Sequence, residues 1–228
     1  MNNEVHSLRS NQEETDTRVV LYIMYAQDKE FKFVVVRTPD SDIFMILLHH
    51  ANSLSITIHL DIGVGKHRRL VNMTELADGY GQDWCTTLLA FYVFTGEDCT
   101  SAFKGKGKVS PLKRLMKYQK YFQKLGDEWT VDEETLEIIE AFTCNIYGYA
   151  KESDVNVVRS KMRRDIIGKD TDLSRRSKVE LAHLPPCEDT LIPHIQRVNH
   201  RVACYKRADI PIFEKKRPSD AGQGCCLN

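Results

Sequence analysis

The first 73 residues alternate helical with extended patterns, and this alternation restricts the fold more than any other feature of the 228-residue chain. From Glu13 apolar residues recur at helical spacing behind an acidic first turn, which the helix dipole favours. The β-branched and aromatic run 31–36 stops at Thr38-Pro39 and predicts a buried strand. The patterns that follow predict a helix at 41–51, a strand at 54–60, a glycine-rich turn at 61–66 and a strand at 68–73. We therefore expect an α/β sheet with parallel members.

Beyond Met73 the strand patterns stop and only helical patterns follow. They cover residues 74–79, 83–94, 110–125, 132–148, 153–167 and 188–208. The second half of the chain is therefore expected to be an α-helical appendage to the sheet. The expected organisation is a disordered lead at 1–12, a core at 13–150, a helical extension at 151–216 and a flexible tail at 217–228.

The composition argues against several classes of partner. The 32 basic and 32 acidic residues cancel, so any attraction to nucleic acid has to be local. The longest apolar run, Ile43 to Leu48, is far shorter than the roughly 20 residues that span a bilayer, so no membrane partner is expected. The 7 cysteines show no paired metal-ligand spacing and are expected to be reduced intracellular thiols. No small-molecule cofactor is expected.

Acidic residues stand at three places where regular elements begin or end. They are Glu14 and Asp16 in the first helix, Asp40 and Asp42 after the first strand, and Glu97-Asp98 after a later helix. Strand ends and helix starts meet at one edge of an α/β sheet, so these groups are able to converge there. Clustered carboxylates are costly without a cation, and hard oxygen ligands suit Mg²⁺ or Mn²⁺. Taken singly, each group is equally explained by helix capping or by an ordinary turn.

The segment from Gly96 to Lys108, GEDCTSAFKGKGK, resembles the part of flap endonucleases in which a catalytic aspartate leads into a helix-two-turn-helix that grips duplex backbone. The segment TPDSD, which ends at Asp42, is similar to the paired aspartates of that family, and Glu14-Thr-Asp16 is similar to its E-x-E helix start. The resemblance is closer still to a group of animal PIN-like proteins associated with mobile elements, and it runs from Ser10 to about Pro211.

This resemblance implies a partial PIN-like, flap-endonuclease-like α/β fold with a parallel sheet, a helix-two-turn-helix and an α-helical C-terminal appendage. It also implies a Mg²⁺- or Mn²⁺-dependent nuclease acting on duplex or junction DNA or RNA. Asp40, Asp42 and Asp98 would be catalytic and would hold one ion, while Glu14 and Asp16 would help to hold another. Such a substrate favours the nucleus over the cytoplasm as the location.

The resemblance starts after the first strand of the family, which carries an aspartate ligand. We therefore expect this chain to lack that strand and two acidic ligands. A missing strand would expose unpaired backbone at the sheet edge, which favours an alternative: a catalytically inactive module that binds nucleic acid or protein. A second departure is Lys106, which stands at a hairpin position that is usually apolar in the family.

The residues from Lys104 to Gly126 are rich in lysine and contain no acid. A glycine hairpin presents backbone N–H groups to a phosphate, and a cationic helix face can continue along the strand. We expect nucleic acid to be bound by Gly105, Lys106, Gly107, Lys108, Lys113 and Lys117. A solvated, lysine-rich helix face is the alternative. A second basic cluster, from Arg159 to Lys178, is interrupted by aspartates and predicts a solvated surface.

Overall fold

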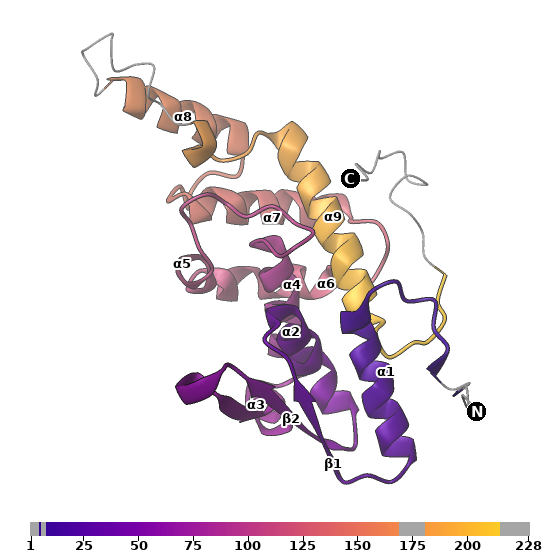
Figure 1. Cartoon of the computed structure of the whole chain (residues 1–228). Helices are drawn as coiled ribbons and strands as arrows, with labels where there is room; N and C mark the ends of the chain where they lie inside the picture. Colours follow the sequence, from indigo (N-terminus) through magenta and orange to yellow (C-terminus); the bar gives the residue numbers. More distant parts are fainter. Residues whose placement is uncertain (1–4, 6–7, 169–180, 215–228) are drawn as a thin grey trace.

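The computed structural model describes residue 5 and residues 8–168 and 181–214, and it confirms an α/β fold (Figure 1). Its strands are β1 (Phe33–Arg37), β2 (Thr57–Ile62) and β3 (Arg69–Asn72), in the order β1-β2-β3. β1 and β2 are parallel, as expected, whereas β3 is antiparallel to β2. The sheet is therefore mixed rather than wholly parallel in the part of the chain that the structure describes.

Helices precede, separate and follow the strands, in the order that the sequence patterns predict. The helices beside the sheet are α1 (Thr15–Asp28), α2 (Ser41–His50) and α3 (Met73–Tyr80). The later helices are α4 (Gln82–Phe94), α5 (Val109–Leu112), α6 (Gln119–Lys124), α7 (Glu133–Ile146), α8 (Val155–Gly168) and α9 (Glu188–Lys206). Short 3₁₀ turns stand at Ala51–Ser53, Gly65–His67, Leu115–Tyr118 and Leu181–His183. None of the helices in the described ranges is both long enough and apolar enough to cross a bilayer.

The prediction of one continuous helix at 110–125 is wrong. The segment is divided into α5, a 3₁₀ turn and α6. Its lysines at positions 113, 117, 120 and 124 would stack at three- and four-residue spacing on one helix face, where like charges repel. This repulsion is consistent with an interrupted helix.

The strand predicted at 31–36 forms, but it is not buried. β1 is an edge strand, and Phe33 and Val35 on one of its faces are 61% and 52% exposed. The apolar composition of this run indicates a strand without specifying how much of it is covered, because coverage depends on which elements pack against each face.

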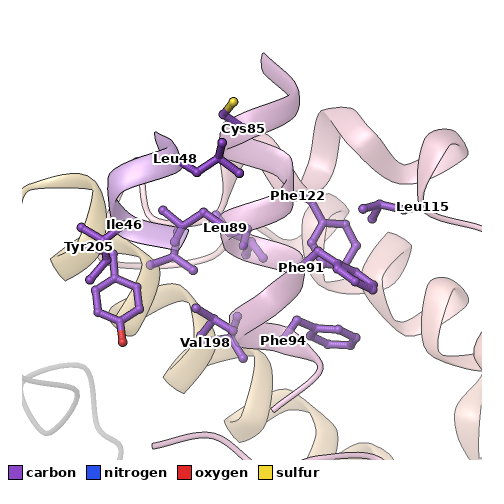
Figure 2. Packing of buried hydrophobic residues seen from close by; sticks show 14 of the residues in the cluster. Ile46, Leu48, Cys85, Leu89, Phe91, Phe94, Leu115, Phe122, Val198 and Tyr205 are labelled. Atoms are coloured by element: carbon purple, nitrogen blue, oxygen red, sulfur yellow. The ribbon is translucent and has the colours of Figure 1, made fainter. Parts of the chain in front are cut away.

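One hydrophobic core connects the sheet with the C-terminal helices. Ile58 and Leu60 of β2 are fully buried. Four phenylalanines from α4, α6 and α7 pack with ring centroids 5.0 to 6.4 Å apart, namely Phe91, Phe94, Phe122 and Phe142. Val198 of α9 joins the same cluster from the far end of the chain (Figure 2). The core therefore continues across the domain boundary expected near residue 150.

Two residues of the expected N-terminal lead make hydrogen bonds to the segment that follows α9. The side chain of Gln12 is buried and donates hydrogen bonds from Nε2 to the carbonyls of Ala208 (3.0 Å) and Ile210 (2.9 Å). Asn11 donates from its backbone N–H to the carbonyl of Pro211. These two residues, expected in a disordered lead, are held by the segment that follows α9. The expected tail at 217–228 lies outside the described residues.

Gly126 provides a test of how tightly α9 packs against the loop after α6. Its φ is +82°, and a Cβ atom there would lie 2.6 Å from the backbone nitrogen of Ala203. Gly148 also has a positive φ, of +96°, but a Cβ atom there would meet nothing within 4 Å. We expect Gly148→Ala to cost about 1–2 kcal/mol through backbone strain alone. Gly126→Ala should cost a further ~1–3 kcal/mol because of the overlap with α9.

Urea denaturation of both variants measures this difference. Equal losses of unfolding free energy would contradict the close approach of α9 to this loop.

Candidate functional site

Three carboxylates surround one guanidinium group. Arg201 of α9 makes an ion pair with Glu14, approaches Glu97 to 3.6 Å and lies 4.0 Å from Asp42. The side chain of Arg201 is 12% exposed, and those of Asp42 and Glu97 are 6% and 0% exposed. Burial opposes the charged form of Arg201, but its hydrogen bond to Glu14 and the nearby Tyr205 and carboxylates raise its pKa. Arg201 is therefore a permanent cation within this cluster.

Asp42 is held by two tyrosines. Tyr92 of α4 donates its hydroxyl proton to Asp42 Oδ1 at 2.5 Å, and Tyr205 of α9 donates to Oδ2 at 2.9 Å. Figure 2 shows the Tyr205 hydroxyl directed away from the apolar side chains that surround its ring. Burial, reinforced by the hydrogen bonds to Asp42, raises the pKa of both tyrosines. Both hydroxyls therefore stay protonated and fix the orientation of the carboxylate.

Glu97 is placed by the tight loop that ends α4. Gly96 has a φ of +107°, and a Cβ atom there would lie 2.7 Å from Ala102 Cα. The Glu97 backbone N–H donates to Thr100 Oγ1 at 3.1 Å, and the same hydroxyl donates to the carbonyl of Val93 at 2.6 Å. Both carboxylate oxygens of Glu97 are buried and make no well-formed hydrogen bond among the described residues, although the Cys99 backbone N–H and the Asp42 side chain lie close enough to affect the pKa of Glu97. Burial raises the pKa of Glu97, and Arg201 acts against that rise.

Glu14, Asp16 and Asp40 occupy helix starts, as the sequence predicts. Asp40 caps α2, because its Oδ1 accepts a hydrogen bond from the Asp42 backbone N–H at 2.8 Å. Glu14 stands at the N-cap of α1 without making a side-chain cap, because its carboxylate pairs with Arg201 instead. The pKa of Asp16 is raised by burial and then by the charges of Asp40, Asp42 and Glu14. These four acids therefore lie close enough to influence one another.

Asp98, expected as a catalytic ligand, is exposed. Its neighbour Glu97 is the acid that faces Arg201. Glu97 is bridged to Thr100, and Asp98 lies in the tight turn between these two residues, on the exposed side of the loop. The E-D dipeptide marks the right place in the sequence, but the choice between its members depends on the loop conformation.

The glycine hairpin forms, but two of its lysines turn inward. Gly105 and Gly107 have φ values of +72° and +55°. Lys106 Nζ lies 4.3 Å from the centre of the Tyr147 ring. Lys108 Nζ donates to the carbonyls of Tyr92 (2.9 Å) and Gly96 (2.6 Å) and to Thr95 Oγ1 (3.0 Å), so it caps the C-terminus of α4.

Lys108 is also linked electrostatically to the acidic cluster. Burial lowers the pKa of Lys108, while Asp42 and Glu97 act to raise it. By contrast, the side chains of Lys113 and Lys117, which follow the hairpin, are exposed. The expected phosphate contacts at Lys113 and Lys117 are therefore accessible, whereas Lys106 and Lys108 are engaged with the protein.

Three residues of this cluster were not expected from the sequence as members of a site, namely Tyr92, Arg201 and Tyr205. Glu97 was expected near the cluster as part of the Glu97-Asp98 pair, but Asp98 was the member expected to be the ligand. The one signal in the sequence is the four-residue spacing of Arg201 and Tyr205, which places both side chains on one face of a helix. That spacing does not indicate which acids the face will meet.

No group of three or more His, Cys, Asp or Glu residues in the described ranges is arranged, as it stands, to hold a metal ion. The chemistry of the donor set nevertheless suits a hard cation. Both oxygens of Glu97 and Oε2 of Glu14 are buried without a hydrogen-bond partner among the described residues. The guanidinium of Arg201 lies among these carboxylates.

Comparison with known protein families, with curated proteins and with solved structures found no match for this chain.

The raised pKa of Glu97 predicts a pH-dependent stability difference. An acid whose folded pKa lies above its ordinary value of 4.5 destabilises the fold once the pH rises above that value. We expect Glu97→Gln to raise the Tm at pH 7.5 by roughly 2–4 °C, because the amide carries no charge to bury. The difference should shrink towards zero as the pH falls to about 4.5, where both side chains are neutral.

Asp98→Asn is the matched control, because this neighbouring acid is exposed and its replacement should change stability by less than about 0.5 kcal/mol. A loss of Tm at pH 7.5 in Glu97→Gln would instead show that ionised Glu97 is well paired.

Proposed function

We propose that the acidic cluster is a divalent-metal centre of nuclease type and that the adjoining lysine-rich segment binds nucleic acid. The observation that carries this proposal is the side chain of Glu97, which is fully buried beside Asp42, with Arg201 3.6 Å away and no well-formed hydrogen bond to either oxygen among the described residues. A buried carboxylate with so little hydrogen bonding is costly, and a hard cation is the ligand that would relieve the cost. Mg²⁺ or Mn²⁺ fits these oxygen donors.

The balance of charge in the cluster supports a cation site. Asp42 acts on both Asp16 and Glu97, and Glu14 also acts on Asp16. Arg201 acts on Asp16 and Glu97, and Lys108 interacts with Asp42 and Glu97. Lys108 is hydrogen-bonded to carbonyls at the end of α4, whereas Arg201 makes direct ion pairs with Glu14, Asp42 and Glu97. We infer that Arg201 takes the role of the metal when none is bound, and that a metal ion and Arg201 compete for the same oxygens.

Asp42, Glu97 and Glu14 would hold the ion, with Asp40 and Asp16 beside them. When bound, Mg²⁺ or Mn²⁺ supplies activation of water and stabilisation of the leaving oxygen in phosphodiester hydrolysis. Tyr92 and Tyr205 keep Asp42 in one orientation, and Arg201, once released, is suited to bidentate contact with a phosphate. Asp98 is exposed and stands next to Glu97 in the chain. We propose that it contacts the ion or a water molecule bound to the ion.

A second candidate is a catalytically inactive module that binds nucleic acid. The observation that favours it is the position of Arg201, which is almost fully buried among the acids and already neutralises them. In this version the guanidinium is a permanent structural counterion, and the exposed Lys113 and Lys117 are sufficient for phosphate contact. Both versions share the nucleic-acid surface and differ only in the metal.

Competition between Arg201 and the metal gives the sharpest test. Arg201→Met leaves buried carboxylates without their cation and should cost roughly 3–5 kcal/mol in metal-free buffer. Millimolar Mn²⁺ should then raise the Tm of Arg201→Met more than that of the unaltered protein, because the ion binds the folded state without displacing a side chain. The measurement is thermal denaturation with Mn²⁺ or with EDTA.

Asp42→Asn in the Arg201→Met background is the matched control, because it removes one ligand and should abolish most of the Mn²⁺ effect. A Tm that is independent of Mn²⁺ in all of these proteins would exclude the metal centre. Duplex binding that persists under that outcome would support the inactive module.

Binding of nucleic acid is tested separately through its salt dependence. If Lys113 and Lys117 neutralise phosphates, the slope of log affinity against log salt concentration should become less steep by about 1.8 in Lys113→Gln/Lys117→Gln. The measurement is fluorescence anisotropy with a labelled duplex in EDTA, so the result does not depend on metal.

The matched control is Lys32→Gln/Lys151→Gln, which removes two exposed lysines from other segments and should leave the slope unchanged. An unchanged slope in Lys113→Gln/Lys117→Gln would remove this surface from the proposal.

A further inference from the structure

A separate cavity of about 400 Å³ lies between the loop after α4 and the first turns of α9. Three cationic side chains line it: Lys104, Arg159 and Arg197. None of the described residues that line the cavity is an acid. Arg159 belongs to the basic cluster that the sequence predicts to be a solvated surface. In the structure it lines this cavity.

The cationic side chains act on the groups inside the cavity. The charge of Arg197 helps to lower the pKa of His194, and that of Arg159 acts to lower the pKa of Tyr147. Arg159 donates a hydrogen bond from Nη1 to the carbonyl of Pro185, which orients its guanidinium group. A cavity with this lining attracts an anion, and arginine is well suited to bidentate contact with a phosphate.

The remaining walls are aromatic. The rings of Phe103 and His194 are 5.5 Å apart, edge to face, and the ring of Tyr147 lies 6.4 Å from that of Phe103. The Tyr147 hydroxyl donates to the carbonyl of Leu184 at 3.5 Å. Aromatic walls favour a planar ring in the ligand, because stacking of a base on such side chains is favourable whatever the base.

His194 adds an unpartnered acceptor. Its side chain is 95% buried, since 5% of the residue is exposed, and Nε2 lies 3.0 Å from the carbonyl oxygen of Phe94. A carbonyl only accepts, so Nε2 carries the proton. Burial lowers the pKa of His194 to about 4, so the ring is neutral at pH 7 and Nδ1 is an acceptor. Nδ1 has no hydrogen-bond partner among the described residues.

From this combination we infer that the cavity binds a phosphorylated nucleotide, with Lys104, Arg159 and Arg197 at the phosphate and Phe103, Tyr147 and His194 around the base. The three cations match a dianionic phosphate. The volume exceeds what inorganic phosphate alone would fill. The buried Nδ1 of His194, which lacks a donor among the described residues, is the acceptor that we assign to a base N–H group.

This site does not depend on the proposed metal centre. The carboxylates that surround Arg201 contribute no lining residue. Thr190, His194 and Arg197 of α9 line the cavity from positions one to three turns closer to the start of the helix than Arg201. The nucleotide is either free or the phosphorylated end of a strand. Both carry the same chemistry, so the experiment separates them by comparing ligands.

The test is isothermal titration calorimetry of the full chain in EDTA, with AMP, adenosine and ribose 5-phosphate as ligands. AMP is expected to bind, and the two fragments to bind at least roughly 10-fold more weakly, because each lacks one half of the contacts. A 5′-phosphorylated oligoadenylate that binds more tightly than AMP would identify the strand end as the ligand. AMP that binds as tightly as the oligoadenylate would identify the free nucleotide.

The variant Lys104→Gln/Arg197→Gln should weaken AMP binding by roughly 10-fold or more. Both side chains are exposed, but Lys104 has another interaction in the protein, so the Tm of the variant is measured alongside to verify that it is folded at the temperature of the titration. The matched control is Lys32→Gln/Arg69→Gln, which removes the same two residue types from exposed positions near the sheet and should leave AMP binding unchanged.

Three results would overturn the inference. They are absence of AMP binding, equal affinity for AMP and ribose 5-phosphate, and equal losses in the two double variants. Because every titration contains EDTA, a failure here leaves the Mn²⁺ test of the metal centre unaffected. A failure of the Mn²⁺ test equally leaves this site standing.

Discussion

The ion pairs of Arg201 connect segments that are far apart in the sequence. This one guanidinium group meets Glu14 at the start of α1, Asp42 in the first turn of α2 and Glu97 after α4. Breaking a buried pair on one side leaves uncompensated charge, which costs far more than an exposed ion pair contributes. The relative placement of α1, α2, α4 and α9 therefore depends on this contact as well as on the apolar core.

The same arrangement joins the acidic cluster to the glycine hairpin. Lys108 reaches back from the hairpin to the last carbonyls of α4, directly before the loop that carries Glu97. Tyr92, which lies under the ammonium group of Lys108 at 4.2 Å, also orients Asp42. A change in the hairpin would therefore be transmitted to Asp42 and Glu97 through these direct contacts.

Helix α9 serves two sites at different positions along its length. Arg201 and Tyr205 face the acids, whereas Thr190, His194 and Arg197, nearer its N-terminus, line the cationic cavity. Val198 and Val202 between them are fully buried in the common core. A rigid helix that is packed along its length is able to hold two sets of polar side chains in fixed positions, which a loop would do less well.

The sequence by itself determined the order of helices and strands and the places where acids meet helix starts, because local periodicity, proline and glycine act within a few residues. It indicated that Glu14, Asp16, Asp40 and Asp42 are able to converge, since helix starts and strand ends share an edge of the sheet. Only the tertiary structure decided that Glu97 rather than Asp98 enters the cluster, because loop conformation sets which side chain faces inward. The contact of Arg201 with acids more than a hundred residues earlier depends on how α9 packs across α4, a long-range choice that helical spacing alone does not specify.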